Sequence, residues 1–124
     1  MPIVRDRDAV RHRLHGSTFH SYAAPATGSR ELCAWRLEVP PGTVGAPHRV
    51  SREEVFLILG GRLTVTLDGV TGDLNPGDVL LVPAGAELSA DNLSGGVVTA
   101  WVTTSVGLQA TMTDGSAVSP PWVR

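Results

Sequence analysis

The residues best suited to chemistry are a histidine and a glutamate in the stretch APHRVSREEVFLILGG, residues 46–61. His48 lies six positions before Glu54, and Glu54 opens a dense apolar run. Imidazole and carboxylate groups are ligands for transition metals, and they also serve as general acids and bases. The position two after His48, where a second histidine would extend a metal-binding pair, is Val50. The stretch therefore indicates a metal site, an incomplete metal site, or an acid–base pair.

Length and composition limit what can surround this pair. The chain has 124 residues, 42% of them hydrophobic and 18% charged, which is typical of one globular domain. A net charge of −2 provides no general attraction to nucleic acid. No apolar run approaches the ~18 residues of a membrane span, and the N-terminal residues lack the apolar core of a secretory signal. With Cys33 as the single cysteine, we expect a cytoplasmic protein with neither a membrane nor a nucleic-acid partner.

Short runs of strand-forming residues separated by glycine and proline dominate the chain, which has 14 glycines and 9 prolines. Helical periodicity is scarce, although residues 5–14 could form a turn of helix. Seven or eight short strands without intervening helices predict a sandwich or a closed barrel. The expected strands are 17–23, 31–39, 54–60, 62–69, 78–83, 86–92 and 96–105.

The segments at the two ends differ from this strand pattern. Residues 1–16 alternate in charge and are expected to form a solvated or subunit-bridging arm before a barrel at residues 17–110. Residues 111–124 form an extended, proline-rich tail that includes Trp122. Because a free tail would expose this large ring to water, we expect it to dock on the barrel or on a partner subunit.

Two blocks of residues carry a resemblance to a known family. The first block reads Gly42, His48, Val50, Glu54, Gly61, and the second reads Gly77, Pro83, Gly85, Leu88, Asn92. Together they resemble the two motifs of the cupin superfamily over residues 42–92. The resemblance implies an all-β, single-domain, cupin-type jelly-roll β-barrel with room for one small ligand. It also implies a homodimer, since cupins of this size commonly pair.

The metal ligands of this family are only partly present. In metal-binding cupins, three histidines and the glutamate converge inside the barrel, and here Val50 and Leu88 occupy two of the histidine positions. Because two protein ligands make a weak site, no cofactor is expected. If a divalent metal such as Zn, Fe, Mn or Ni is bound, His20 would have to join His48 and Glu54 as an unusual ligand.

Without a metal, His48 and Glu54 are the candidate catalytic residues, joined by a hydrogen bond directly or through one water. A carboxylate in an apolar pocket has a raised pKa, so this pair could move a proton near neutral pH. The resemblance then implies a metal-independent isomerase, epimerase or cyclase acting on a small organic molecule. A metal-dependent oxygenase or isomerase and a non-catalytic metabolite sensor remain as alternatives. The expected pocket-lining residues are Val50, Phe56, Leu88, His20 and Trp35.

Overall fold

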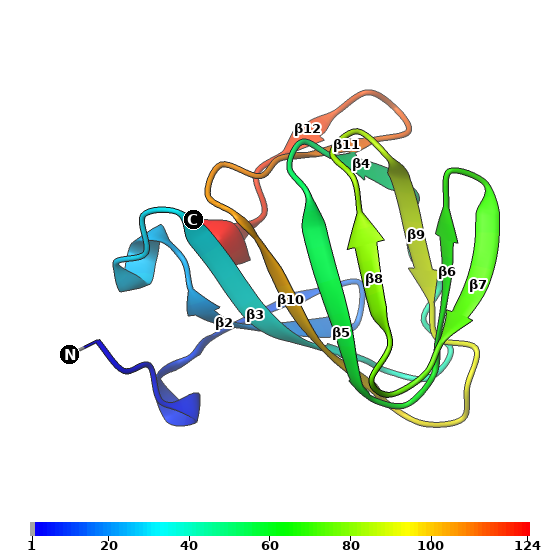
Figure 1. The fold of residues 1–124 in the computed structure, drawn as a ribbon, viewed down its shortest axis with the longest axis horizontal. Coiled ribbons are helices and arrows are strands. Elements are labelled where there is room, and N and C mark those ends of the chain that lie inside the picture. Colours follow the sequence, from blue (N-terminus) through cyan, green and yellow to red (C-terminus); the bar gives the residue numbers. More distant parts are fainter. Residues whose placement is uncertain (1) are drawn as a thin grey trace.

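The computed structural model describes residues 2–124, and strands make up most of this part of the chain (Figure 1). The strands form two antiparallel six-stranded sheets. In neighbour order, the first sheet contains β1 (Val10–Leu14), β2 (Ser17–Ala23), β3 (Leu32–Val39), β10 (Val98–Ser105), β5 (Glu54–Gly60) and β8 (Val79–Val82). The second sheet contains β12 (Ala117–Val118), β11 (Ala110–Met112), β4 (His48–Val50), β9 (Glu87–Asp91), β6 (Leu63–Leu67) and β7 (Val70–Leu74). The 3-10 turns η1 (Asp6–Asp8), η2 (Pro25–Thr27) and η3 (Pro121–Val123) complete these elements, and no helix of residues 2–124 is long and apolar enough to cross a membrane.

The all-β prediction is confirmed, and the arrangement is consistent with a jelly roll. Within residues 2–124, however, no strand pairing joins the two sheets into one closed barrel. The chain crosses from sheet to sheet through turns instead. One example is the turn between β7 and β8, where the backbone N–H of Asp78 donates to the carbonyl oxygen of Asn75 at 2.9 Å.

Side-chain alternation places the core between the sheets. In β3, Cys33, Trp35, Leu37 and Val39 are buried, and the residues between them are less buried or exposed. β10 alternates in the same way and pairs with β3 along its whole length. Successive side chains of a strand point to opposite faces, so each of these strands contributes one face to the core.

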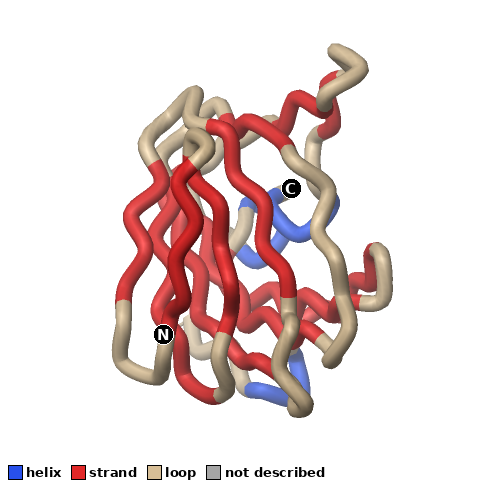
Figure 2. Tube along the Cα trace, turned by 90° about the vertical axis from the view of Figure 1, so that its right-hand side faces the viewer, coloured by secondary structure: helices blue, strands red, loops and turns tan. Residues whose placement is uncertain are grey.

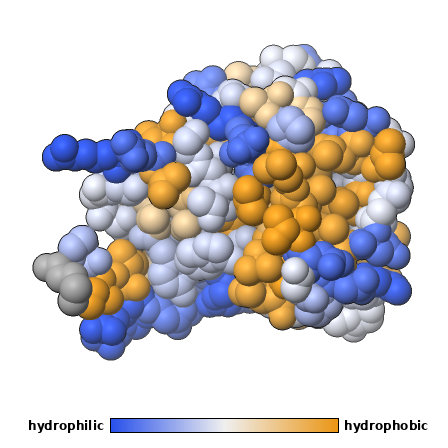
Figure 3. Space-filling view, viewed as in Figure 1, coloured by the Kyte–Doolittle hydropathy of each residue, from blue (hydrophilic) through white to orange (hydrophobic). Residues whose placement is uncertain are grey.

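The apolar run of β5 is covered differently from the prediction. A continuous apolar run predicts a strand covered on both faces. Glu54, Phe56 and Ile58 are indeed buried on the inner face, but Leu59 on the outer face is 51% exposed. Val79 and Leu81 of the neighbouring strand β8 are also more than half exposed, and Figure 3 shows a broad apolar surface over this region. The run of β5 is therefore apolar on both sides, although only one side forms the core.

The glycine and asparagine positions of the two motifs have structural roles. Gly61 has φ of +79°, and a Cβ atom there would lie 2.7 Å from the carbonyl oxygen of Val97. Asn92 is fully buried, and its Nδ2 donates to the carbonyl oxygens of Val39 at 2.9 Å and Gly96 at 2.8 Å. These residues shape the turns that bring the ends of neighbouring strands together.

The N-terminal residues form regular structure that the sequence pattern does not show. Residues 10–14 are strand β1, which pairs with β2 at the edge of the first sheet, so this segment is not a free arm. β1 and β7 are mostly exposed and lack the alternation of apolar residues that identifies strands. The short strands β4, β11 and β12 were also missed, because two or three residues carry too little pattern.

The C-terminal segment docks on its own subunit. After β12, the turn η3 places Trp122 and Val123 in the core, where they are 8% and 4% exposed. The hydroxyl of Ser21 donates to the carbonyl oxygen of Trp122 at 2.9 Å. Figure 2 shows this C-terminal turn inside the outline of the strand layers and not projecting from them.

Candidate functional site

A cavity of about 450 Å³ lies between the two sheets, which is large enough for a small organic ligand. Residues of the first sheet form one wall, and residues of the second sheet form the opposite wall. The first wall includes Phe19, Trp35, Leu37, Val39, Glu54 and Phe56. The opposite wall includes His48, Val50, Leu88, Ala90, Ala110 and Met112. The β1–β2 turn, residues 43–46 and the C-terminal segment complete the lining.

Glu54 is the one acidic group in the lining of this cavity among residues 2–124. The side chain begins β5, points to the inner face and is 5% exposed. Its carboxylate accepts no hydrogen bond from the described residues. Burial disfavours the charged form and raises the pKa of Glu54 to about 7. The carboxyl group can therefore both release and take up a proton near neutral pH.

His48 lies on the second sheet and faces the same cavity. Its Nδ1 is 2.9 Å from the carbonyl oxygen of Ala46. A carbonyl oxygen only accepts, so Nδ1 carries the proton and Nε2 is the basic nitrogen of the neutral ring. No direct hydrogen bond joins His48 to Glu54 within residues 2–124, and a contact through one water stays a prediction.

The family's metal position does not fit a metal in this chain. Val50 lies two residues after His48 on the inner face of β4, and Leu88 is the cross-strand partner of His48. Both alkyl side chains are 2% exposed and have no donor atom. Across the part of the chain described, three or more His, Cys, Asp and Glu side chains nowhere gather into a group able to hold a metal ion.

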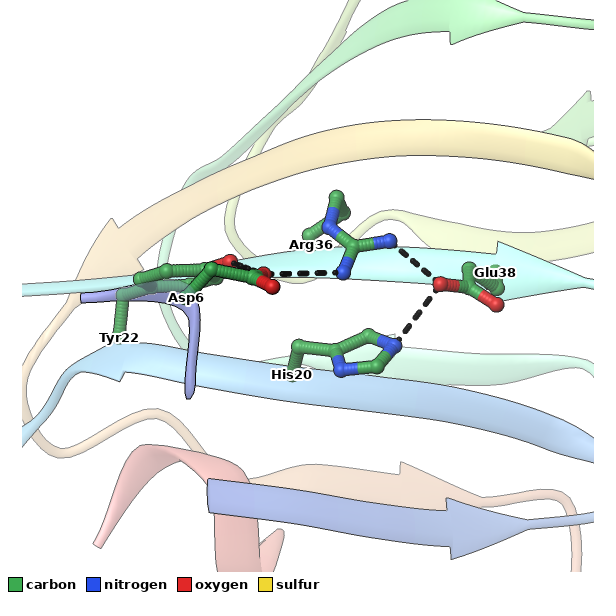
Figure 4. Close-up of polar contacts among 5 residues, drawn as sticks. All are labelled: Asp6, His20, Tyr22, Arg36 and Glu38. Atoms are coloured by element: carbon green, nitrogen blue, oxygen red, sulfur yellow. Dashed lines mark hydrogen bonds and ion pairs between the residues drawn. The ribbon is translucent and has the colours of Figure 1, made fainter. Parts of the chain in front are cut away.

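His20 does not line the cavity, which corrects the prediction. Phe19 faces the cavity from β2, and strand alternation turns the next side chain to the outer face of the sheet. There the Nε2 of His20 lies 2.9 Å from Oε1 of Glu38 (Figure 4). His20 therefore cannot complete a metal site with His48 and Glu54.

The contact of His20 belongs to a chain of polar groups across β2 and β3. Glu38 also accepts from Arg36, which in turn pairs with Asp6 at 3.4 Å, and Asp6 accepts from the hydroxyl of Tyr22 (Figure 4). Burial opposes the ionisation of Glu38, but its contacts with Arg36 and His20 outweigh burial and lower its pKa. We call these five residues, Asp6, His20, Tyr22, Arg36 and Glu38, the outer-face network.

The aromatic part of the cavity comes from three distant segments. The rings of Phe19 and Trp122 stack with centroids 3.6 Å apart at an interplanar angle of 7°. Trp35 lies beside Trp122, with centroids 6.4 Å apart. Trp35 Nε1 is buried and has no hydrogen-bond partner within residues 2–124. The sequence pattern placed Trp35 in the pocket but missed Phe19 and Trp122, because the residues of β2 do not alternate between apolar and polar types.

The cavity and the motif positions can now be compared with known proteins. A family model described as the cupin domain matches residues 35–104, more than half of the chain. The chain belongs to the cupin family. No curated protein matches the sequence of this cupin.

Solved structures show the same fold. A polyketide cyclase from Streptomyces resistomycificus has a TM-score of 0.76 and 20% identity, covering 85% of this cupin and 79% of that chain. A sugar phosphate isomerase from Silicibacter pomeroyi has a TM-score of 0.74 and 18% identity, and the match covers 91% of this cupin and 82% of that chain. The cupin domain of Cnp3 from Schizosaccharomyces pombe has a TM-score of 0.65 and 21% identity, covering 80% and 69%. At these identities the similarity establishes the fold, and function has to be argued from the site.

Proposed function

We propose that this cupin catalyses metal-independent proton transfer on a small organic molecule, as an isomerase, epimerase or cyclase. Glu54 moves the proton, and His48 is a second acid–base group in the same cavity. The observation that carries the proposal is a buried carboxyl group whose pKa is about 7 and whose oxygens accept no hydrogen bond within residues 2–124. The same fold occurs in a polyketide cyclase and in a sugar phosphate isomerase, so it can hold sites for such reactions.

The environment of Glu54 suits a general base. A carboxylate removes a proton from carbon more readily when neither water nor fixed hydrogen-bond donors stabilise its charge. The neighbouring inner-face residue Phe56 is apolar, as is most of the lining. An ionised Glu54 is thus destabilised by its apolar surroundings, and it becomes neutral when it takes a proton from a substrate.

His48 is placed to complete the transfer from the opposite wall. With Nδ1 donating to Ala46, the neutral ring presents Nε2 as a proton acceptor. A substrate lying between the two walls would meet Glu54 on one side and His48 on the other. This arrangement suits a reaction in which one group removes a proton and another returns it to a different atom or face.

The proposal can be tested with 5-nitrobenzisoxazole, a generic probe for a base in an apolar site. A carboxylate removes the C3 proton, the C–H electron pair forms the nitrile, and the N–O bond breaks to release a phenolate. We expect the rate to rise with pH toward a plateau above about pH 7 and to ignore EDTA. Glu54→Gln should lower the rate by roughly 100-fold or more, whereas Glu53→Gln, an exposed neighbour, should not. An unchanged rate in Glu54→Gln would refute the proposal.

Non-catalytic binding of a metabolite is the second candidate. It is favoured by the absence of a hydrogen bond between His48 and Glu54, because a preassembled acid–base pair would be the clearer sign of catalysis. A pure binding protein should take up ligands in the cavity yet show the same probe rate before and after Glu54→Gln. The elimination assay therefore separates the two candidates.

A further inference from the structure

We infer that the ligand of the cavity is a flat, largely apolar ring compound with one hydroxyl or carbonyl oxygen, and not a sugar or sugar phosphate. This inference deepens the proposed function and rests on the same site. Three observations carry it: the scarcity of polar partners in the cavity, the aromatic wall, and the position of Glu54 relative to that wall.

The cavity has few groups that could bind a polyhydroxylated ligand. In its interior, Glu54 and His48 are the ionisable side chains, and Nδ1 of His48 is already bonded to Ala46. Arg13 is the one arginine or lysine among the lining residues of the part of the chain described, and its side chain is exposed at the end of β1. A sugar would leave most of its hydroxyls without partners in this cavity, and unpaired buried hydroxyls weaken binding. One oxygen on an apolar body matches what the walls provide.

The aromatic wall is flat and firmly held. The rings of Phe19 and Trp122 are nearly parallel in their stack, and the ring of Trp35 is tilted against that of Trp122. Trp122 is fixed because Ser21 binds its carbonyl oxygen, and the backbone N–H of Ala26 donates to the carbonyl oxygen of Arg124 at 3.3 Å. Planar rings stack on such surfaces, whereas a puckered ring contacts them at fewer points.

Strand register sets the distance between this wall and the carboxyl group. Trp35 pairs with Val102, and Val102 pairs with Phe56, two residues from Glu54 on β5. With strands about 4.8 Å apart and a rise of about 3.4 Å per residue, the Cα atoms of Trp35 and Glu54 are roughly 12 Å apart. A fused bicyclic ring can therefore contact the aromatic wall while its oxygen, or an adjacent carbon, faces Glu54.

Calorimetric titration at pH 6 can test the ligand class with two molecules of similar size, 2-naphthol and decahydro-2-naphthol, with glucose as a polar comparison. We expect 2-naphthol to bind at least tenfold more tightly than its saturated analogue, and glucose to show no binding. Trp122→Leu should remove most of this preference, and Trp122→Phe should retain it. Trp101→Leu, on the outer face of the first sheet, is the matched control and should change nothing. Equal affinity for the two bicyclic molecules, or tighter binding of glucose, would overturn the inference.

The two proposals fail in different ways. If the naphthol preference is absent but elimination still depends on Glu54, then the ligand class is wrong and the proton-transfer function stands. If the naphthol preference is present but elimination does not depend on Glu54, then the ligand class stands and the proton-transfer function is wrong.

Discussion

Replacing Glu54 by glutamine should change how the stability of this cupin depends on pH. The pKa of Glu54 rises from its ordinary value of 4.5 to about 7 in the folded protein, a difference of about 2.5 pH units. At about 1.4 kcal/mol per pH unit, ionising this carboxyl group in the folded state costs about 3 kcal/mol relative to the unfolded chain. Glutamine has nearly the same shape and cannot ionise, so the variant avoids this cost.

The sign follows from proton binding. Between pH 4.5 and 7 the folded state holds the proton of Glu54 more tightly than the unfolded chain, so the free energy of unfolding falls as the pH rises. Below pH 4.5 Glu54 is protonated in both the folded and the unfolded state, and above about pH 7 the free energy of unfolding is lowered by the full amount. We therefore expect Glu54→Gln to match the wild type near pH 4 and to exceed it by about 3 kcal/mol at pH 8.

Urea denaturation of both proteins from pH 4 to pH 8.5, followed by circular dichroism, measures this difference directly. The exposed neighbour provides a matched control, because Glu53→Gln should shift the curve by a nearly constant amount at every pH. A constant difference between Glu54→Gln and the wild type would refute the reasoning. It would mean that the carboxyl group is hydrated or paired in the folded protein, and the proposed base would lose its main support.

Three further substitutions test other parts of the structure. The double variant Val50→His, Leu88→His places two imidazoles beside His48. The visible absorption of added Co²⁺ should show that this variant binds one cobalt ion per chain, whereas Val50→His alone should bind cobalt weakly. Trp35→Phe removes a buried N–H that has no hydrogen-bond partner, so chemical denaturation should show that the free energy of unfolding falls by no more than about 1 kcal/mol. A fall of more than about 2 kcal/mol would mean that the N–H is hydrogen-bonded in the folded protein. Gly61 has φ of +79°, and an added Cβ atom would lie 2.7 Å from a backbone oxygen. Gly61→Ala should therefore lower the free energy of unfolding by more than about 1 kcal/mol, and an unchanged value would show that the turn adapts to the methyl group.

Much of the fold could be predicted because the strongest strands carry a complete pattern. β3 alternates strictly, and the motif residues Gly61 and Asn92 occupy turns that other residues would resist. β1 and β7 could not be predicted, since a mostly exposed strand is held by backbone hydrogen bonds that any sequence can make. Their existence depends on the neighbouring strands and not on their own side chains.

In the candidate site, too, some features follow from residue type alone and others depend on the tertiary structure. The sequence by itself determined that His48 and Glu54 are the family's remaining polar positions and that Val50 and Leu88 offer no metal ligand, because donor atoms are a property of residue type. Only the tertiary structure decided that His20 turns to the outer face.

The tertiary structure also decided that Trp122 completes the aromatic wall, and that Nδ1 of His48 contacts the carbonyl oxygen of Ala46. These outcomes depend on strand phase, on sheet pairing and on a segment that returns from 101 residues away, as the contact between Ser21 and Trp122 shows. Residue type sets which chemistry is available, whereas burial and register between distant strands set which groups meet and how strongly each holds its proton.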